Sequence, residues 1–397
     1  MNKRNENRPG YKETKAGWIP ESWEVVSFDN IAKRRKERFN PKNGKNFKCI
    51  ELEHIEQTTG IVIGYVNSKD QASTKNKFYP NDVLFGKLRP YLRKYTLVDF
   101  EGVCSSEIWV FKNQSISMPE FVHLIVQSNK FIAYSNKTSG TKMPRAEWDL
   151  ISGINFPLPP LHEQQKIASI IFTWDKAIEL VGKQIEAKQR LTKGLMQQLL
   201  TGKIRFPRYS GNWHELKILS VAQVIMGQSP NSSAYNDAGL GLPLIQGNTD
   251  IKDRKTAPRM YTSVITRQCE IGDIILSVRA PVGETSWSLH EACIGRGVCA
   301  IRATKTDSKF LFYKLVFDES RWIRFAQGST FEAINSKDIR NLSIWIPCSL
   351  SEQSHIASVF VAIDGEIELL NKHILKLRRQ KQGLMQKLLT GEVRVKL

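Results

Sequence analysis

The chain has 397 residues, too many for one core of ordinary size, so we expect at least two domains. With 41% hydrophobic and 24% charged residues, and no apolar run near the ~18 residues of a membrane helix, the composition excludes a membrane-spanning protein and predicts a soluble, cytoplasmic one. The net charge of +19 is spread over the whole length, which favours a body that binds a polyanion such as nucleic acid.

The first 20 residues are polar and lack the hydrophobic stretch of a secretory signal, so we expect a flexible lead-in over residues 1–20. The six cysteines have no CxxC spacing, and the seven histidines form no paired ligand pattern with them. We therefore expect free thiols and no metal site in this chain.

Residues 21–157 are predicted to form a first domain. It opens with "IPESWEVVSF", in which Trp23 is expected to anchor a first strand in the core because of its size. In "NDVLFGKLRPYLRKY" at 81–95, a polar turn precedes a short apolar run and an arginine beside a proline, which predicts a strand leaving a tight turn. The segment "TSGTKM" at 138–143 either presents backbone N–H groups to a phosphate or forms an ordinary turn.

A duplicated segment follows the first domain. "GLMQQLLTGKIRF" at 194–206 recurs as "GLMQKLLTGEVRV" at 383–395. Extended backwards without gaps, residues 161–206 align with 350–395 at a constant offset of 189, and 22 of the 46 positions are identical. Such a match is an internal duplication.

Both copies carry hydrophobic residues at alternating steps of four and three, which is the pattern of a heptad seam. Each copy is therefore predicted to be one long helix. Two equivalent helices related by a pseudo-twofold axis perpendicular to them run antiparallel, so we expect an antiparallel coiled coil. The seam consists of Ile167, Ile171, Trp174, Ile178, Val181, Ile185, Leu195 and Leu199 in the first copy, interrupted by Lys188 and Thr192, and of Ile356, Phe360, Ile363, Ile367, Leu370, Ile374, Leu377, Leu384 and Leu388 in the second, interrupted by Lys381.

Signals for the helix ends agree with this prediction. "SLSE" at 349–352 fits a capping box, and Gly202 and Gly391 stand where a left-handed glycine would end each helix. Gly194 and Gly383 lie inside the helices, where glycine costs about 1 kcal/mol relative to alanine. We expect a close backbone approach at these two positions to offset that cost.

Residues 207–347 are predicted to form a second domain of similar size. It also opens with a tryptophan, Trp213, and "IGDIILSVRAPVGE" at 271–284 repeats the order of turn, apolar run, arginine and proline. A Gly/Ser/Thr segment, "QGSTFEAI", follows at 327–334. Between these landmarks the two domains hardly match in sequence, which suggests two different targets.

The chain resembles the DNA-specificity subunits of type I restriction-modification systems. The resemblance runs from "GWIPESWEVV" to the C-terminus, and "FPLPPLHEQQKIASII", "LSEQSHIASVF", "GDIILSVRAPVG", "QGSTFEAI" and the duplicated "GLMQ" segments carry it. It implies an α+β fold, in which two α/β-type target-recognition domains, 21–157 and 207–347, are separated by two long helices forming an antiparallel coiled coil. The conserved helical regions would be 158–206 and 348–397. "WIPCSLSEQ" at 345–353 departs from the usual "PLPPL", which puts only the entry angle of the second helix in doubt.

The resemblance also implies a function. Each recognition domain would recognise one half of a bipartite, asymmetric DNA site, and the helical pair would space the domains and dock methyltransferase subunits. The expected partners are double-stranded DNA, two methyltransferase (M) subunits and two restriction/translocase (R) subunits. S-adenosylmethionine, ATP and Mg would be used by these partners, and no cofactor would be bound by this chain.

Motifs for catalysis are not found in the sequence. A DNA methyltransferase needs a glycine motif for its cofactor and an N-P-P-Y type tetrapeptide for a flipped adenine, and neither is present. We also find no GxxxxGK[ST] loop for a motor and no nuclease cluster of paired carboxylates with a lysine. We therefore expect a non-catalytic subunit.

Arginine and lysine recognise guanine edges and phosphates best, so basic residues of both domains, with two hydroxyl residues of the second Gly/Ser/Thr loop, are the candidates for DNA contact. For each of them, a solvated surface charge is the alternative. The run "KRRKER" at 33–38 is expected to face phosphates or plain solvent rather than bases. The candidates are Lys87, Arg89, Arg93, Lys94, Lys142 and Arg145 in the first domain and Lys252, Arg254, Lys255, Arg259, Arg279, Ser329 and Thr330 in the second.

Two other classes of function fit the residues. One is a stand-alone DNA-binding scaffold in which a coiled coil joins two domains. The other is an RNA-binding factor, because a basic charge alone does not separate RNA from DNA. Neither the recognised base sequence nor the spacer length follows from the sequence of the chain.

Overall fold

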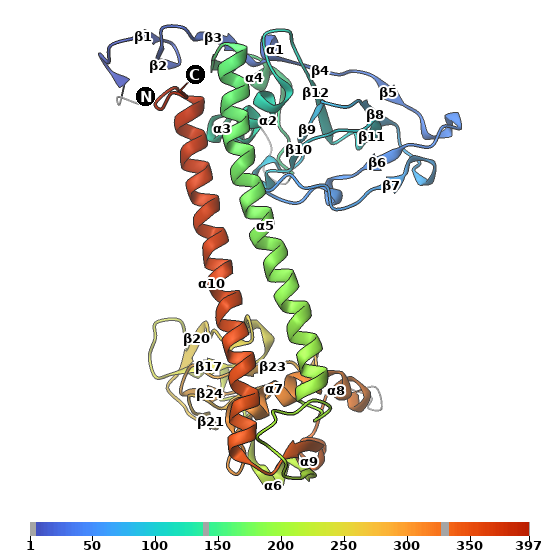
Figure 1. Ribbon diagram of the computed structural model, residues 1–397, viewed down its shortest axis with the longest axis vertical. Helices are drawn as coiled ribbons and strands as arrows, with labels where there is room; N and C mark the ends of the chain where they lie inside the picture. The colour runs from blue at the N-terminus through green and yellow to red at the C-terminus, as the bar shows by residue number, and fades with distance from the viewer. Residues whose placement is uncertain (1–4, 138–142, 327–332, 397) are drawn as a thin grey trace. The chain divides into compact units, whose positions relative to one another are not determined.

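The computed structural model describes residues 5–137, 143–326 and 333–396 (Figure 1). The chain divides into two compact units, the first comprising Met1–Val181 with His373–Leu397 and the second Gly182–Lys372. Both predicted long helices are present, α5 (Leu161–Leu199, 39 residues) and α10 (Leu350–Leu389, 40 residues). Among the described residues, no helix is both long and apolar enough to cross a membrane.

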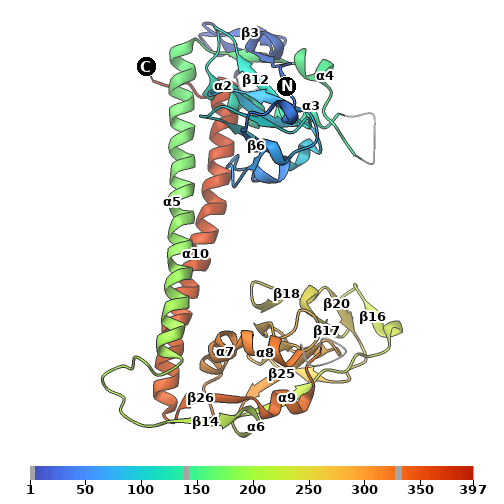
Figure 2. The same ribbon diagram turned by 90° about the vertical axis from the view of Figure 1, so that its right-hand side faces the viewer.

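In the first unit, the N-terminal half of α5 and the C-terminal half of α10 lie side by side and run antiparallel (Figure 2). Lys381 Nζ lies 2.5 Å from Asp175 Oδ1 across the pair. Beyond the end of α10, Arg394 Nη2 lies 2.5 Å from Oε1 of Glu163, in the first turn of α5. The other carboxylate oxygen of Glu163 accepts a hydrogen bond from Trp23 Nε1 at 3.1 Å. Trp23, which stands just before β3 (Glu24–Ser27), is therefore anchored in the core, as predicted.

In the second unit, the other halves of the same two helices are also antiparallel. Lys188 pairs with Glu366 across the pair. Beyond the end of α5, Arg205 donates from Nε and Nη2 to the two carboxylate oxygens of Glu352, at 2.8 and 2.7 Å. Trp213 Nε1 also donates to Glu352, at 3.4 Å. Here too, the predicted tryptophan anchor is confirmed.

These contacts confirm the internal repeat at the level of side chains. Arg205 and Arg394 are equivalent residues at the offset of 189, and so are Glu163 and Glu352. Each arginine follows one helix and binds the buried glutamate that begins the other, so a single contact occurs twice with the roles of the helices exchanged. Such reciprocity is what a pseudo-twofold axis produces.

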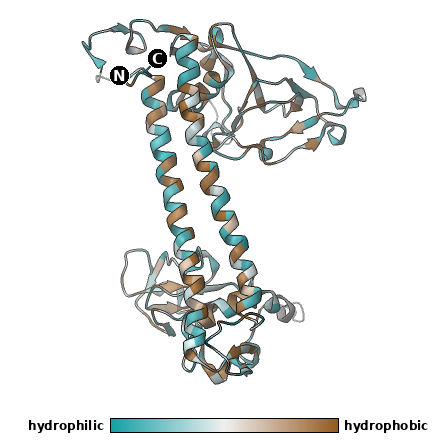
Figure 3. Ribbon diagram, in the orientation of Figure 1, coloured by the Kyte–Doolittle hydropathy of each residue, from teal (hydrophilic) through white to brown (hydrophobic). Residues whose placement is uncertain are grey.

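The heptad seam is visible in the exposure of the helices. The predicted seam positions are buried or half-buried, whereas most residues between them are exposed. Ile167, Ile171, Ile356 and Phe360 are at most 2% exposed, because they also contact the core of their unit. Hydrophobic residues accordingly recur along both helices in Figure 3.

Both helices begin and end as the sequence predicts. Ser349 Oγ accepts a hydrogen bond from the backbone N–H of Glu352 at 3.3 Å, which is the N-terminal half of the predicted capping box. Gly202 and Gly391 have φ of +74° and +70°, the left-handed conformation that glycine adopts without steric cost. A Cβ atom at Gly391 would lie 2.5 Å from Pro20 Cδ, so side chains are excluded there by packing as well.

The close backbone approach predicted at Gly194 and Gly383 is wrong. Both glycines are exposed, and a Cβ atom at either would have nothing within 4 Å. The cost of an interior glycine, about 1 kcal/mol, is therefore not offset by a close contact with any described residue.

The predicted lead-in also differs from the structure. Residues Tyr11–Thr14 (β1) and Gly17–Pro20 (β2) pair as an antiparallel hairpin. Tyr11 Oη donates to the carbonyl oxygen of Gly391 at 2.7 Å, and Ile19 is 1% exposed. The segment is ordered because it covers the C-terminal end of α10, where Gly391 is 380 residues away from Tyr11 along the chain.

Besides the β1–β2 hairpin, the described residues of the first unit form two larger sheets and a two-stranded ribbon. The ribbon joins the strand after Trp23 to the last strand before α5. Short helices pack against the four-stranded sheet. The four-stranded sheet has the order β10 (Tyr95–Leu97), β9 (Val83–Gly86), β12 (Ile108–Asn113), β4 (Ala32–Arg34); the five-stranded sheet has the order β5 (Arg38–Phe39), β8 (Lys75–Phe78), β11 (Gly102–Cys104), β6 (Lys48–Ile50), β7 (Val66–Asn67); the ribbon pairs β13 (Asn155–Leu158) with β3 (Glu24–Ser27); and the helices are α1 (Phe28–Ile31), α2 (Pro119–Gln127), α3 (Asn129–Ser135) and α4 (Trp148–Ser152).

The second unit contains the same kinds of elements. Its ribbon begins at Trp213 and ends just before α10. The six-stranded sheet has the order β15 (Ala222–Met226), β25 (Val298–Ala303), β22 (Ile274–Ser277), β23 (Thr285–Trp287), β19 (Lys255–Thr256), β18 (Ile251–Lys252); the five-stranded sheet has the order β16 (Tyr235–Asn236), β20 (Met260–Thr262), β17 (Leu242–Ile245), β24 (Ala292–Ile294), β21 (Gln268–Cys269); the ribbon pairs β14 (Trp213–Lys217) with β26 (Ser343–Pro347); and the helices are α6 (Ile218–Val221), α7 (Ser308–Phe317), α8 (Glu319–Ala326) and α9 (Ser336–Asn341).

The two domains share a strand topology although their sequences hardly match. The order β4–β12–β9–β10 in the first unit corresponds to β15–β25–β22–β23 in the second. In each unit the second sheet contains one parallel pair, β6 with β11 and β17 with β24, flanked by antiparallel strands. The duplication therefore includes the domains as well as the helices. Each main core takes residues from its own domain and from both helices.

Candidate nucleic-acid interface

In the first unit, three chain segments meet where β9 and β12 end, and we call residues 86–90, 105–107 and 144–146 the first corner. Lys87 donates its backbone N–H to the carbonyl oxygen of Glu107 at 2.9 Å, and its own carbonyl oxygen accepts from the N–H of Ala146 at 2.8 Å. Leu88 and Arg145 form an antiparallel bridge. The predicted strand, its arginine and its proline thus lead directly into this corner.

The second unit repeats the arrangement in residues 277–281, 295–297 and 333–334, which we call the second corner. Val278 donates its N–H to the carbonyl oxygen of Gly297 at 2.9 Å and accepts from the N–H of Ile334 at 3.0 Å. Arg279 and Ala333 form the antiparallel bridge. The two corners are therefore equivalent, with Val278 in the place of Lys87 and Arg279 in the place of Leu88.

Two of the predicted DNA contacts meet at the first corner. Arg145 Nε lies 3.0 Å from Glu107 Oε2, and Lys87 Nζ lies 4.0 Å from the same oxygen. Half of the Arg145 side chain is exposed. One carboxylate therefore holds both cations in place and neutralises part of their charge.

Three further candidates flank the short helix Pro90–Leu92, which begins at the edge of the first corner. Arg93 donates to Asn129 Oδ1 at 3.1 Å, and Lys94 donates to the carbonyl oxygen of Leu52 at 2.6 Å. Arg89 is exposed, and its guanidinium has no partner among the described residues. Of these three side chains, Arg89 alone is available to a ligand without breaking an internal contact.

The backbone at Arg89 and Arg93 is left-handed, with φ of +51° and +52°. A residue with a Cβ atom pays roughly 1–2 kcal/mol for this conformation. Backbone bonds compensate it, since Arg89 donates to the carbonyl oxygen of Pro144 and Arg93 to that of Pro90, at 2.8 and 2.9 Å. The two left-handed residues thus stand on either side of the short helix Pro90–Leu92.

Some of the predicted DNA-contacting residues of the second domain are bound to acidic side chains of the protein, and others are not. Arg254, in the two-residue turn between β18 and β19, donates from Nη1 and Nη2 to both carboxylate oxygens of Glu319, at 2.5 and 2.9 Å. These hydrogen bonds raise the pKa of Arg254 above its ordinary value. Arg254 also donates to the carbonyl oxygen of Thr285 at 3.1 Å, so its guanidinium joins elements of the domain.

Lys255 is also bound internally. Its Nζ lies 2.8 Å from Oε2 of Glu368 on α10, while Lys372 Nζ lies 2.8 Å from Oε1. Hydrogen bonds from the two lysines lower the pKa of Glu368 to about 2. Lys252, on β18, is exposed and has no side-chain partner among the described residues.

The side chain of Arg259 is bound to an acidic residue, whereas that of Arg279 is not bound to any described residue. Arg259 Nε lies 3.4 Å from Oδ1 of Asp250, a buried residue that is 4% exposed. Arg279 is exposed at the second corner, and its guanidinium has no partner in the described part of the chain. Only Lys252 and Arg279 of the predicted basic residues in this domain are thus unbound.

A hollow of about 380 Å³ lies at the second corner. Arg279, Arg296, Gln246 and Asn248 line it, together with the cis Ala280–Pro281 peptide. The hollow therefore brings two guanidinium groups and two carboxamides together on one part of the surface.

Gln246 and Arg296 were not among the residues predicted from the sequence. A usable signal was present in "GRG" at 295–297, where a glycine stands on each side of an arginine. A Cβ atom at Gly297 would lie 2.1 Å from the carbonyl oxygen of Gln246, so glycine is required for these segments to meet. Gln246 itself is brought there by the parallel pairing of β17 with β24, which sequence periodicity does not predict.

The remaining candidates, Lys142, Ser329 and Thr330, lie outside the described residues, as do most of the two Gly/Ser/Thr loops. Their role in DNA contact stays a prediction.

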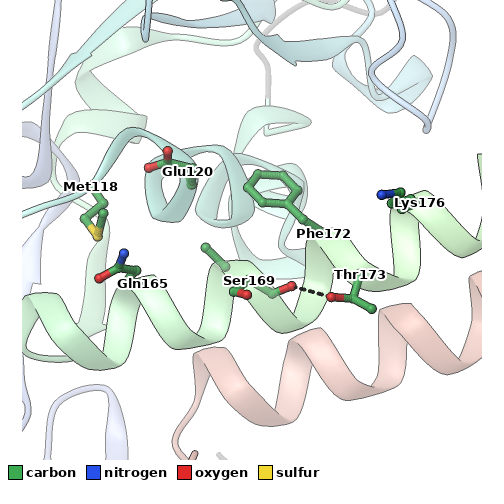
Figure 4. Close-up of a pocket in the computed structure, with 8 residues that line it drawn as sticks. Met118, Glu120, Gln165, Ser169, Phe172, Thr173 and Lys176 are labelled. Atoms are coloured by element: carbon green, nitrogen blue, oxygen red, sulfur yellow. Dashed lines mark hydrogen bonds between the residues drawn. The ribbon is translucent and has the colours of Figure 1, made fainter.

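A second pocket lies in the first unit between α2 and α5, lined by Met118, Glu120, Phe172 and Lys176 among others (Figure 4). None of the predicted DNA-contacting residues that the structure describes lines it. Its one lysine is accompanied by a glutamate, so it lacks the surplus of positive charge that attracts DNA phosphates.

The cysteines take no part in either corner. All six are free thiols and five are buried. Burial raises the pKa of Cys49 to about 12, so this thiol is unreactive. Among the described residues, no three His, Cys, Asp or Glu side chains are placed to hold a metal ion.

A model of the type I restriction modification DNA specificity domain matches the chain twice, over residues 20–189 and 210–379. Each match spans one domain and most of the helix that follows it. The chain belongs to the type I restriction-modification DNA specificity family. The resemblance carried by the duplicated helices is thereby confirmed.

Members of this specificity family align with almost the whole chain. The protein named as the MjaX specificity subunit of Methanocaldococcus jannaschii is 30% identical over 414 residues, which cover 97% of both chains. A chain from a solved structure, titled "Structural basis underlying complex assembly and conformational transition of the type I R-M system", is 28% identical with a TM-score of 0.66, over 94% of this chain and 99% of that one. The S subunit of a type I system from M. genitalium is 13% identical with a TM-score of 0.57, over 92% of this chain and 96% of that one, and it shares the fold.

Proposed function

We propose that this chain provides the DNA sequence specificity of a type I restriction-modification complex, each domain recognising one half of a bipartite, asymmetric site. One observation carries the proposal. The same domain fold occurs twice on the same helical frame, and the DNA specificity model matches both copies. Because the frame is repeated while the side chains at the two corners differ, the two domains are suited to two different half-sites.

The helical pair supports the second part of the proposal, in which it spaces the domains and docks methyltransferase subunits. The reciprocal pairs of Arg205 with Glu352 and Arg394 with Glu163 make the two ends of the frame chemically alike. A partner that binds one end therefore finds an equivalent surface at the other, so two M subunits bind per chain. Two R subunits complete the assembly.

The chemistry belongs to the partners in this proposal. The chain acts in the cytoplasm and is non-catalytic, while the M subunits use S-adenosylmethionine and the R subunits use ATP and Mg. The chain contributes the choice of sequence through its exposed basic residues, whose contacts with phosphates and bases give affinity and specificity respectively.

The test compares the purified chain with the chain bound to its methyltransferase. Incubated with unmethylated genomic DNA and S-adenosylmethionine, the complex is expected to methylate adenines in a single two-part motif, which methylation sequencing reveals. The chain alone is expected to leave the DNA unchanged. A complex containing a methyltransferase with an inactivated active site serves as the control.

Two results would overturn the proposal. Methylation or cleavage by the chain alone would show that it is an enzyme. Methylation without any sequence motif would show that it does not confer specificity. Native mass spectrometry is expected to give two M subunits per chain, and a 1:1 complex at saturation would contradict the docking proposal.

A further inference from the structure

The hollow at the second corner contains polar side chains that are not used within the protein. The guanidinium groups of Arg279 and Arg296 have no hydrogen-bond or ion-pair partner among the described residues, and neither has the carboxamide of Gln246. Arg279 and Arg296 are exposed, and Gln246 is half-buried. Three side chains with unmet hydrogen-bonding capacity therefore line one hollow.

The two arginines of the hollow differ from three other basic residues of the second domain. Arg254, Lys255 and Arg259 are bound to carboxylates, at 2.5, 2.8 and 3.4 Å respectively. Arg254 and Arg259 thus link parts of the domain and Lys255 links the domain to α10, while the two arginines of the hollow have no carboxylate partner among the described residues. A guanidinium that has no internal partner keeps its donors for a ligand.

The backbone that carries these side chains is held firmly. Gln246 donates its N–H to Asp250 Oδ2 at 2.9 Å, and Arg296 donates its N–H to Ser229 Oγ at 3.1 Å. Asn248 donates to Glu284, while its own Oδ1 is buried without a donor among the described residues. Rigid support of this kind reduces the entropy lost when a ligand is bound.

The equivalent positions in the first domain carry different chemistry. Arg279 corresponds to Leu88 by the bridge of each corner. Because Gly295 donates to Ile245 as Ser105 donates to Ile50, the residues after them correspond as well: Arg296 with Ser106, and Gln246 with Glu51. Two arginines and a glutamine thus occupy the positions of a leucine, a serine and a glutamate.

We propose that Arg279, Arg296 and Gln246 determine the specificity of the second domain by contacting base edges, and that the half-site of this domain contains G·C pairs bound by the two arginines. The proposal rests on the proposed function, because it concerns the same DNA. Arginine donates two hydrogen bonds to O6 and N7 of guanine, and glutamine donates to and accepts from adenine in the major groove. A leucine, a serine and a glutamate cannot make this set of contacts, so the equivalent place in the first domain selects different bases.

The experiment uses the complete complex with its methyltransferase and unmethylated genomic DNA. The variants are Arg279→Ala, Arg296→Ala and Gln246→Ala. The matched control is Arg267→Ala, because Arg267 is an exposed arginine of the same domain that has no side-chain partner among the described residues and does not line the hollow. Methylation sequencing then gives the motif of each variant.

Each variant of a hollow residue is expected to relax the motif at one or two positions. The positions affected by the three variants are expected to lie in the same half of the motif, and those affected by the two arginine variants are expected to be G·C pairs. The preference for the correct base is expected to fall about 5- to 150-fold per arginine, the range that corresponds to 1–3 kcal/mol for a bidentate base contact. The other half of the motif and the motif of the Arg267→Ala control are expected to stay unchanged.

A binding measurement covers variants whose methylation is lost. Competition between duplexes with and without the wild-type motif is expected to show a lower ratio of specific to non-specific affinity, with non-specific binding at low salt retained. Equal weakening on both duplexes, with a salt slope reduced by about one, would mean phosphate contact and overturn the proposal. An unchanged motif, or relaxation in both halves, would overturn it too. If the wild-type complex itself showed no two-part motif, the proposed function would fail instead.

Discussion

Alanine substitutions at four helix glycines, made one at a time, test whether glycine stabilises the ends of the long helices and destabilises their interior. Gly202 and Gly391 end α5 and α10 in the left-handed conformation, whereas Gly194 and Gly383 lie in the helix interior. Each compact unit contains one glycine of each kind, so each unit carries its own control.

At the helix ends, alanine is expected to destabilise the protein. A left-handed alanine costs roughly 1–2 kcal/mol, which applies to both positions. At Gly202 the new Cβ atom would lie 3.3 Å from the ring of Trp213, a contact that a small shift relieves. At Gly391 it would lie 2.5 Å from Pro20 Cδ, and overpacking of this kind adds roughly 1–3 kcal/mol. We expect a loss of about 1–2 kcal/mol for Gly202→Ala and about 2–5 kcal/mol for Gly391→Ala.

In the helix interior, alanine is expected to stabilise. Nothing lies within 4 Å of a Cβ atom at Gly194 or Gly383, so the substitution removes backbone entropy from the unfolded chain without a clash. The gain is about 1 kcal/mol for each. The contrast between Gly383→Ala and Gly391→Ala, both on α10, is therefore about 3–6 kcal/mol.

The assay is urea or thermal unfolding of the purified chain, followed by near-ultraviolet circular dichroism. For units of this size, 1 kcal/mol shifts the melting temperature by roughly 2–4 °C, so the pair on α10 is expected to differ by at least about 6 °C. Destabilisation by Gly194→Ala or Gly383→Ala in the isolated chain would refute the reasoning, because it would reveal a close contact at a position where the structure has open space. The same variants in the methyltransferase complex then show whether a partner approaches these glycines.

Three further predictions concern buried charge, pH and modularity. Glu352→Gln is expected to destabilise the second unit by about 2 kcal/mol, because the carboxylate is 1% exposed and accepts two hydrogen bonds from one arginine. Glu186→Gln, at an exposed ion pair, is expected to change the free energy of unfolding by less than about 0.5 kcal/mol. Equal effects of the two variants in urea titrations would contradict this prediction. Burial, and secondarily a nearby lysine, lowers the pKa of His123 from 6.5 to about 3, so between these values only the unfolded chain binds the proton, and the free energy of unfolding falls by about 1.4 kcal/mol for each pH unit of acidification. His123→Phe is expected to remove about 2 kcal/mol of the difference in stability between pH 7 and pH 5. An unaltered pH dependence in this variant would show that the histidine is not buried in its neutral form. Exchanging residues 207–347 for the corresponding domain of a relative is expected to change one half of the methylated motif, and a change in both halves would disprove independent recognition.

The sequence alone was sufficient for the features that depend on neighbouring residues. The heptad seam and the terminal glycines are properties of short stretches, since helix periodicity and capping are decided within a few turns. For that reason the two long helices were predicted correctly. Their antiparallel pairing followed from the symmetry of the duplicated segment, and the tryptophan anchors at Trp23 and Trp213 followed from the size of the side chain. The hairpin at residues 11–20 was missed, because its order comes from the distant end of α10.

The candidate site shows what depended on tertiary structure. Arg254 and Arg279 are both arginines near turns, and their neighbouring residues do not show which of them is bound to an acid. Arg254 is bound by Glu319, 65 residues away, and Lys255 by Glu368, 113 residues away, whereas Arg279 meets no carboxylate in the described part of the chain. Whether a basic side chain holds the domain together or remains available to DNA is decided by which distant acid the fold brings beside it, because electrostatic interactions depend on distance in space and not along the chain.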